Sequence, residues 1–424
     1  MEKRREELMK NRLWLATSLI LGAGLMIALL TVAALAQESA PTAWVGSWQP
    51  GPDMDATIWG GPAGEGLARF SGHYYSGTKK IYFLGGRREN NDTTGVIFTF
   101  DPNSLAYAAT GRTMPLPISN YYISQVDDDG RGHGPGLYVV AGRLSNGSMT
   151  QAVQVYYPDD NTAEQLTGAS FPGAARLVGG QAVVEDQIYV FGGFDGATMF
   201  ADTWVYSPTA QTWTNLNCPL PTARSYIATA VAGHKIYAIG GDEFTGAALV
   251  PLTDTLVLDT DNLAACWQDD LMADLPQANG DAPAVYVDEG YLGGGIYVIG
   301  GYWPQPGPYR WVFRYDLATD TWEDFPQLTV PDPATGRRNQ AAVYVPASAQ
   351  ASPMGLGGGI PGLWTFGGYD GSDANAMTES SEFFSIEANP VLVLPEQVER
   401  VGVGGSNVVH QFYLVNQAGF TDTF

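Results

Sequence analysis

Charged residues and cysteine are scarce in this sequence, and each shortage excludes a class of protein. Charged residues make up 15% of the 424 residues, with 21 Lys and Arg against 44 Asp and Glu, which gives a formal net charge of −23. So acidic a surface repels nucleic acid and anionic lipid, and we expect no nucleic-acid partner. Since Cys218 and Cys266 are the only cysteines, a disulfide framework does not build this fold.

Sequence motifs of enzyme chemistry are scarce too. The chain has no nucleophile elbow, phosphate loop or zinc-binding helix motif. The acidic segments 127–130 and 259–262 lack the spacing of a calcium loop. The four histidines do not converge on a metal-ligand pattern: His73, His133, His234 and His410. We expect no metal and no cofactor, and we favour a non-enzymatic protein over an enzyme.

The first 36 residues have the features of an export signal. A basic start precedes an almost uncharged run from Leu13 to Leu35, and Ala34 and Ala36 are the small residues that a signal peptidase requires. We expect cleavage after Ala36 and an extracellular or cell-surface location. The apolar run also matches the roughly 20 residues that span a bilayer. An uncleaved anchor stays open as the alternative, and it is the only membrane contact that we expect.

Glycine and aromatic residues are abundant, and together they mark a repeat. Six aliphatic-aromatic runs end in a small doublet, and the last glycines of successive runs lie 56, 51, 48, 60 and 67 residues apart. The runs are 81–86, 137–142, 188–193, 236–241, 296–301 and 363–368. This period is too long for a helical solenoid and suits one small sheet per repeat.

The third repeat shows the unit most clearly. Residues 177–184 and 188–193 flank a short polar turn and predict a hairpin of two buried strands. Residues 203–206 and 212–215 predict a second hairpin around a turn that contains Pro208. Each repeat is therefore expected to form a four-stranded antiparallel sheet. Such sheets are apolar on both faces, and six of them can close into a ring that leaves only short edges exposed.

These features resemble Kelch repeats, whose hallmarks are a glycine doublet after the second strand and a Tyr and a Trp at fixed offsets beyond it. The resemblance, within the superfamily that includes galactose oxidase, implies an all-β, six-bladed propeller over residues 37–388, with four antiparallel strands per blade. The sixth repeat lacks a clear fourth strand, and residues 42–52 resemble one. We expect this N-terminal strand to close the ring, with Trp48 or Trp44 packed where other blades carry Trp213 and Trp322.

The cysteines lie at different places within neighbouring repeats. Cys218 follows Trp213 by five residues, whereas Cys266 directly precedes Trp267. Because the two positions do not correspond, we favour unpaired cysteines over a bond between them.

The C-terminal segment changes character. Residues 389–424 have a Val-rich strand pattern that resembles the start of an immunoglobulin-like module of a bacterial surface protein. Such a module needs about 100 residues for its two sheets. We therefore expect residues 389–424 to be a linker and the truncated start of that module, and the sequence to be a piece of a longer protein.

A shared register predicts a ligand site at one face of the ring. Arg69, Arg176 and Arg224 each stand twelve residues before a doublet-bearing run. Matching the other repeats to them adds Asn120, Asn279 and Arg337. Gathered around the channel mouth, guanidinium groups would bind carboxylates or sulfates, as arginines do in the Kelch substrate adaptors that the chain resembles. The alternative is a structural role, with each arginine tying loops to backbone carbonyls.

Aromatic residues on loops at the same face are candidates for stacking a sugar or, alternatively, for holding the loops in place: Trp303, Tyr309 and Phe244. We expect a monomeric binding or adhesion module for an anionic glycan or an acidic protein or peptide. A sugar-modifying enzyme similar to the sialic-acid mutarotases is the runner-up, and a structural spacer without a ligand is the third alternative.

Overall fold

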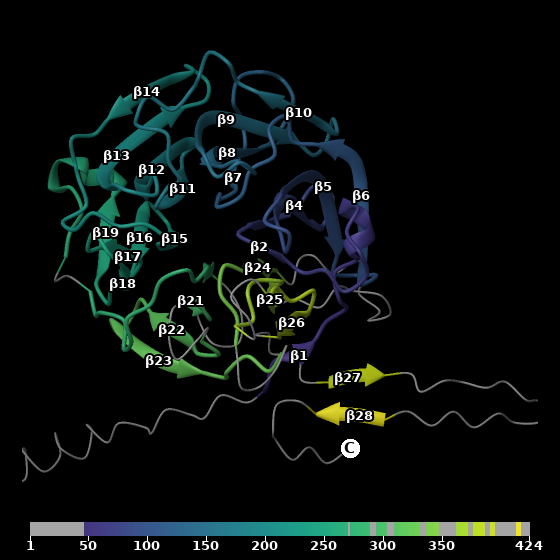
Figure 1. Cartoon of the computed structure of the whole chain (residues 1–424). Coiled ribbons are helices and arrows are strands. Elements are labelled where there is room, and N and C mark those ends of the chain that lie inside the picture. Colours follow the sequence, from purple (N-terminus) through teal and green to yellow (C-terminus); the bar gives the residue numbers. More distant parts are fainter. Residues whose placement is uncertain are drawn as a thin grey trace, which may run out of the picture. The chain divides into compact units, whose positions relative to one another are not determined.

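The computed structural model of the chain describes residues 46–269, 272–288, 294–302, 309–330, 336–346, 362–371, 376–385, 391–394 and 413–416. Within this part, six antiparallel sheets follow one another around a ring, as the sequence predicts (Figure 1). The innermost strand of each sheet lines the centre of the ring, and the sheets radiate outward from it.

The first three blades have complete sheets. Blade 1 contains β3 (Gly72–Tyr75), β4 (Lys80–Arg88), β5 (Thr93–Asp101) and β6 (Ala106–Thr113), with the short β2 (Leu67–Ala68) on β4 and the 3-10 helix η1 (Ala56–Trp59) before it. Blade 2 contains β7 (Ser124–Val126), β8 (Gly136–Arg143), β9 (Met149–Tyr157) and β10 (Thr162–Gln165). Blade 3 contains β11 (Gly180–Val184), β12 (Gln187–Phe194), β13 (Met199–Ser207) and β14 (Thr212–Asn215).

Blades 4 to 6 vary the plan at their outer edges. Blade 4 contains β15 (Ala228–Ala232), β16 (Lys235–Ile239) and β19 (Thr255–Asp259), with a hairpin of β17 (Asp242–Phe244) and β18 (Leu249–Pro251) and the 3-10 helix η2 (Thr260–Ala265). An isolated bridge from Val257 to Gln268 occupies its outer edge. Blade 5 contains β20 (Ala284–Val287), β21 (Gly295–Ile299), β22 (Val312–Asp316) and β23 (Thr321–Phe325). Blade 6 contains β24 (Ala341–Val345), β25 (Gly362–Phe366), β26 (Ser381–Phe384) and β1 (Gln49–Pro50).

The N-terminal strand closes the ring, as predicted. β1 pairs with β26, with Gln49 opposite Phe383. Trp48 is 2% exposed, and its indole N–H donates to the carbonyl of Pro326 over 2.8 Å. Trp213 and Trp322 donate in the same way, over 2.8 Å each, to a carbonyl in the loop before their own blades. The prediction for Trp48 is therefore confirmed, whereas Trp44 lies outside the described residues.

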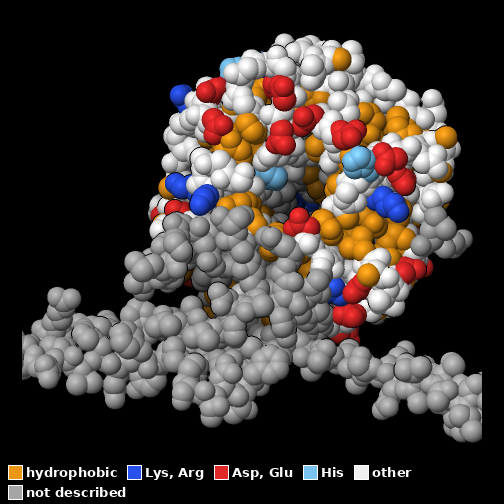
Figure 2. All heavy atoms as spheres, turned by 180° about the vertical axis from the view of Figure 1, so that it is seen from behind, with side chains coloured by type: hydrophobic (Ala, Val, Ile, Leu, Met, Phe, Trp, Pro, Cys, Tyr) orange, Lys and Arg blue, Asp and Glu red, His pale blue; other side chains and the backbone are white. Residues whose placement is uncertain are grey.

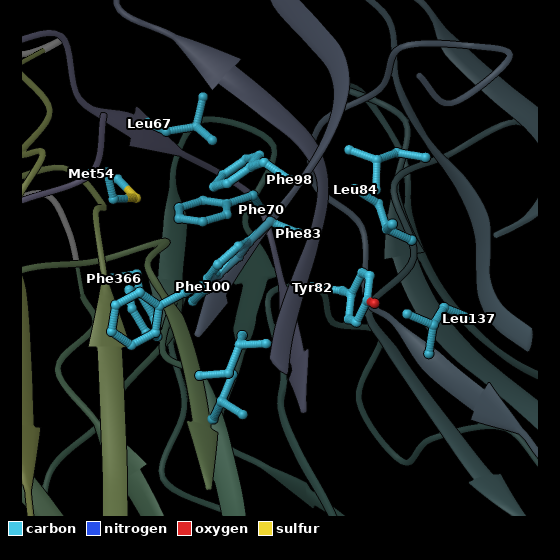
Figure 3. Close-up of a cluster of buried hydrophobic side chains, with 14 of the residues drawn as sticks. Met54, Leu67, Phe70, Tyr82, Phe83, Leu84, Phe98, Phe100, Leu137 and Phe366 are labelled. Carbon is cyan, nitrogen blue, oxygen red and sulfur yellow. The ribbon is translucent and has the colours of Figure 1, made fainter. Parts of the chain in front are cut away.

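Aromatic rings fill the spaces between blades. Phe366 of blade 6 packs against Phe83 and Phe100 of blade 1, with ring centroids 5.1 and 5.3 Å apart. Figure 3 shows these rings on one side of β4, while Tyr82 projects from the other side toward Leu137 of blade 2. Successive residues of a strand face opposite sides of the sheet, so one run serves two interfaces. Rings in tilted and edge-on contacts bury large areas there.

The glycine doublet joins each blade to the next. The second glycine, Gly193, donates its N–H to the carbonyl of Arg224 in the following blade over 2.9 Å. At the first glycine, Gly192, φ is 63°, and a Cβ would lie 2.4 Å from that same carbonyl oxygen. A side chain cannot fit at this approach, which explains why the run ends in glycine.

The expectation of unpaired cysteines is wrong. Cys218 and Cys266 form a disulfide with a Cα–Cα distance of 5.1 Å. Cys218 follows the outermost strand of blade 3, and Cys266 precedes the outer-edge position of blade 4. These outer edges adjoin across the interface between the two blades, so positions that differ within the repeat still meet in space.

Beyond the ring, β27 (Val391–Leu394) pairs with β28 (Tyr413–Asn416) in an antiparallel two-stranded sheet. The immunoglobulin-like identity of this segment and the domain boundaries stay predictions. In the described part of the chain, no helix is long and apolar enough to cross a membrane. The export signal lies outside that part, so its cleavage also stays a prediction.

Candidate ligand-binding mouth of the channel

Of the six residues that the shared register predicts, five are buried, and four of these hold equivalent positions in the wall of the ring. Arg176, Arg224 and Arg337 are 0 to 2% exposed, and Asn279 is 3% exposed. Each donates to the carbonyl of the first glycine of its own doublet, over 2.8 to 3.3 Å. The acceptors are Gly192, Gly240, Gly367 and Gly300, for Arg176, Arg224, Arg337 and Asn279.

The guanidinium groups also have carboxylate partners. Arg176 pairs with Asp202, with contacts of 2.5 and 3.2 Å, and Arg224 pairs with Asp254. Arg337 lies 3.1 Å from Glu382, and both side chains are fully buried. These contacts give the three arginines a structural role, which is the alternative that the sequence left open. A ligand would reach them only by displacing these partners.

Arg69 and Asn120 occupy a different position from the other four. The residue before each of them bridges to the strand beyond the doublet, Ala68 with Arg87 and Ser119 with Arg143. In blades 3 and 4, the residue that forms this bridge instead follows the predicted arginine: Leu177 follows Arg176, and Ser225 follows Arg224. The six residues therefore do not form one ring. The turn between the first two strands has four residues in blade 1, 76–79, but only two in blade 3, 185–186. Counting back twelve residues from the run in both blades therefore gives Arg69, which lies two residues after the true equivalent of Arg176.

The true inner rim of the mouth consists of equivalent residues in a left-handed conformation, with φ between 52° and 59°. Their backbones form a chain of hydrogen bonds around the rim: Asn120 donates to Arg69, Arg69 to Asn339, Asn339 to Asp281 and Asp281 to Tyr226, over 2.8 to 3.2 Å. All five line the central cavity, which encloses about 200 Å³. Non-glycine residues rarely adopt this conformation, and such strain often accompanies a functional rim.

Four arginines gather on blades 6, 1 and 2 at this mouth: Arg69, Arg87, Arg143 and Arg338. Burial lowers the pKa of Arg87, and the positive charges of Arg69 and Arg143 lower it further, so these side chains lie within electrostatic reach of one another. Within the described residues, the only carboxylate paired with any of the four is Asp281, 3.4 Å from Arg338. Among the described residues, these arginines therefore outnumber the carboxylates paired with them.

Blades 4 and 5 supply an acidic and polar side to the same mouth. Asp281 accepts from the amide of Asn339 over 2.5 Å, and Arg338 donates to the side-chain oxygen of Asn339 over 2.9 Å. Asp242 is 4% exposed. Burial raises the pKa of Asp242 well above its ordinary value, and the negative charge of Asp281 raises it further.

The centre of the channel is partly filled. The hydroxyl of Tyr122 in blade 2 donates to the carbonyls of Gly179 in blade 3 and Ile227 in blade 4, over 2.6 and 2.9 Å. Its ring therefore reaches toward neighbouring blades below the rim.

The loop aromatics differ from the expectation of exposed stacking residues. Tyr309 is 7% exposed and lies between Tyr302 and Trp311, with ring centroids 4.9 and 4.1 Å away. Phe244 is half-buried against Phe194, at 5.1 Å. Trp303 lies outside the described residues. The sequence analysis missed these three arginines because Arg87 and Arg143 directly follow the small doublets and Arg338 stands beside Arg337.

The opposite face of the ring holds histidines in turns between first and second strands. His133 contacts Asp160 over 2.7 Å, and His234 contacts Asp261 over 2.8 Å. Figure 2 shows histidine and many acidic side chains around the central hollow on the side turned away in Figure 1. No three His, Cys, Asp or Glu side chains of the described residues are arranged to hold a metal ion.

The closed ring of six four-stranded sheets, joined through glycine doublets, defines a repeat propeller. The chain belongs to the Kelch-repeat family: the KLHDC2/KLHL20/DRC7 Kelch-repeats domain matches residues 72–289 and 131–358. Kelch propellers are in general protein-binding modules.

Three curated proteins give the range of similarity. Kelch-like protein terF of Aspergillus terreus is 29% identical over 190 residues, 41% of this chain and 38% of that protein. Kelch-like protein 26 of Danio rerio is 24% identical over 253 residues, 57% of this chain and 38% of that protein. N-acetylneuraminate epimerase of Pasteurella multocida is 38% identical over 79 residues, 17% of this chain and 21% of that protein. The chain thus spans well under half the length of each.

Proposed function

We propose that this protein is an exported, monomeric binding module that takes an anionic ligand at the mouth of its propeller. The observation that carries the proposal is the group of Arg69, Arg87 and Arg143, which lie within electrostatic reach of one another in a chain of net charge −23. Arg69, Arg87 and Arg143 have no ion-pair partner in the described part of the chain. Carboxylates or sulfates of an acidic peptide or glycan would supply the missing negative charge.

The electrostatics favour selective capture at this face. Most of the acidic surface repels anions, whereas the concave basic mouth attracts them, so the contrast concentrates the ligand where it binds. Asn120 and Asn339, which line the central cavity, would add neutral hydrogen bonds that orient it. Export is supported by the signal-like leader and by the Cys218–Cys266 disulfide, because disulfides persist in oxidising compartments.

The test compares the exported chain with an Arg87→Ala/Arg143→Ala variant on an array of anionic and neutral glycans and on a panel of acidic peptides. Both residues are only half-buried, so the variant should fold. We expect retention of an anionic ligand by the native protein, weakening at higher salt, and at least a tenfold loss in the variant. Lys235→Ala, an exposed change at the opposite face, should bind as the native protein does. Equal retention by the double variant, or failure to retain any anionic ligand, rejects the proposal.

A second candidate is an enzyme of the sialic-acid mutarotase type. The similarity to N-acetylneuraminate epimerase favours this candidate. The chain is 38% identical over 79 residues to that enzyme, which is named after an acidic sugar. Asp281 lines the central cavity and would act as the base, beside the arginines where the sugar carboxylate would bind. Exchange between anomers of N-acetylneuraminate, followed by NMR, distinguishes the candidates. A rate equal to that in buffer removes the enzyme.

A further inference from the structure

Blade 5 departs from its neighbours at two positions that change together. Blades 3 and 4 have the ion pairs Arg176–Asp202 and Arg224–Asp254. The strand registers place Trp311 of blade 5 at the position of these aspartates. Each of the three residues directly precedes the residue that pairs with the last residue before the glycine doublet. At the position equivalent to Arg176 and Arg224, blade 5 has Asn279, whose shorter side chain reaches the carbonyl of Gly300 alone. Blade 5 has therefore exchanged an ion pair for a large aromatic ring.

Trp311 is fixed in a stack rather than loosely exposed. Its ring lies 4.1 Å from that of Tyr309 at an interplanar angle of 25°, and Tyr309 in turn stacks on Tyr302 at 4.9 Å. Tyr309 is buried, whereas Trp311 is half-exposed. A rigid aromatic face that remains partly open to solvent can bind a flat apolar surface without losing much side-chain freedom.

A cavity of about 350 Å³ adjoins this ring. Its lining combines aromatic and aliphatic surface with a few polar groups: Pro276, Gln277, Trp311, Val312, Phe313, Asp324, Phe325 and Gln327. The volume lies in the range of small-molecule sites, which pair an apolar lining with few polar groups that orient the ligand. The cavity lies between the loop that enters blade 5 and the outer strands β22 and β23, separate from the central channel.

The polar groups of the cavity are available to a ligand. Gln327 is oriented by Arg310, which donates to its amide oxygen over 2.7 Å and leaves its N–H groups free to donate. Gln277 and Asp324 are exposed, and neither hydrogen-bonds another described residue through its side chain. One carboxylate and two amides beside an aromatic face provide acceptors and donors without the group of arginines found at the mouth.

We propose that this cavity, the Trp311 cavity, binds the ring of a neutral pyranose. The C–H face of the sugar would pack on Trp311, while its hydroxyls would donate to Asp324 and exchange hydrogen bonds with Gln277 and Gln327. A pyranose offers a C–H face to the aromatic part of the lining and hydroxyl groups to the polar part. Neither contact requires a charge on the ligand. The cavity is independent of the channel mouth, so the inference goes beyond the proposed anion binding and does not rest on it.

The experiment uses the exported chain with the methyl pyranosides of glucose, galactose, mannose and N-acetylglucosamine at millimolar concentration. Saturation-transfer-difference NMR should show transfer to the C–H protons of one face of at least one sugar, and titration should quench tryptophan fluorescence. Trp311→Ala should weaken that binding at least tenfold, and Asp324→Ala severalfold. Asp324 is exposed, so this variant remains informative if Trp311→Ala perturbs the stack.

Two matched controls separate this cavity from other parts of the molecule. Trp204→Ala removes a half-buried tryptophan from blade 3, and Arg87→Ala/Arg143→Ala alters the mouth. Both should bind the pyranoside as the native protein does. The inference is overturned if none of the four sugars receives saturation, or if Trp311→Ala and Asp324→Ala bind with native affinity. Loss of anion binding in the mouth variant with pyranoside binding retained would keep the two proposals distinct.

Discussion

The repeat position that the buried arginines occupy accepts different residues in different blades. In blades 3 and 4, this position holds an arginine that pairs with an aspartate. In blade 1, the strand registers place Leu67 at the arginine position and Val96 at the aspartate position. An apolar pair of suitable shape is often as stable as a buried ion pair, while a single unpaired charge is costly. The two positions therefore have to be both charged or both apolar, and neither of them requires an arginine.

This matching predicts the behaviour of Arg224→Leu. The variant should lose about 3 kcal/mol of unfolding free energy because it leaves Asp254 beside an apolar group, and the 25% exposure of Asp254 keeps the loss at the lower end for a broken buried pair. The double variant Arg224→Leu/Asp254→Val, copied from blade 1, should recover most of that loss. Urea unfolding measures both, and losses that simply add would contradict the matched-pair interpretation.

The buried carboxyl of Asp242 predicts a pH dependence of stability. Burial holds its pKa well above the usual 3.8, so the folded protein keeps a proton that the unfolded chain releases as the pH rises. Unfolding free energy is lost as the pH rises through the folded pKa, by about 1.4 kcal/mol for each pH unit that separates the unfolded from the folded pKa. Asp242→Asn removes this contribution, so the variant should gain stability relative to the native protein between pH 4 and pH 8. A difference that stays constant with pH would contradict the prediction.

At the scale of strands, the regular parts of the chain could be predicted and the irregular parts could not. The runs ending in glycine predicted the second strands, and the missing outer strand of blade 6 predicted β1, because both follow from hydrophobic pattern. Arg69 was misplaced because turn length varies between blades. The disulfide was missed because sequence offsets within a repeat do not report which outer edges adjoin. The mouth arginines have no spacing pattern of their own, and only the folded ring brings them together.

The disulfide predicts a measurable contribution from the outer edges of blades 3 and 4. It connects residues 48 positions apart, and closing a loop of that length restricts the unfolded chain by about 4 kcal/mol in the chain-entropy description. Cys218→Ala/Cys266→Ala should therefore lower the unfolding free energy by about 2 to 4 kcal/mol. Adding a reductant should destabilise the native protein and leave the double variant unchanged. A native protein insensitive to reductant would argue against the bond.

At the scale of the whole molecule, six sheets form one structure because the ring closes. Only two residues of β1 pair with β26, and Trp48 anchors them to blade 5. The interfaces beside this closure include the densest aromatic packing in the described part of the ring, between Phe366, Phe83 and Phe100. Loss of the closing strand would expose two blade edges at once.

Trp48→Ala tests this closure against Trp213→Ala, which removes the same type of contact from blade 3. Trp48→Ala should cost about 3 to 5 kcal/mol because that side chain is fully buried, whereas Trp213 is half-buried and its removal should cost less. Hydrogen exchange should show lost protection in blade 6 extending into blade 1 for Trp48→Ala, and loss confined to blades 2 and 3 for Trp213→Ala. Equally local effects in both variants would show that the ring does not depend on this closure.

The antiparallel pairing of β1 with β26 also determines how the molecule responds to mechanical pulling. The chain enters β1 and leaves β26 at the same end of their short ladder, since Gln49 lies opposite Phe383. Tension applied through both termini would therefore peel the ladder apart one bond at a time rather than shear all its bonds together. Under such tension the ring would open first at this join, in blade 6, which also supplies Arg338 to the channel mouth.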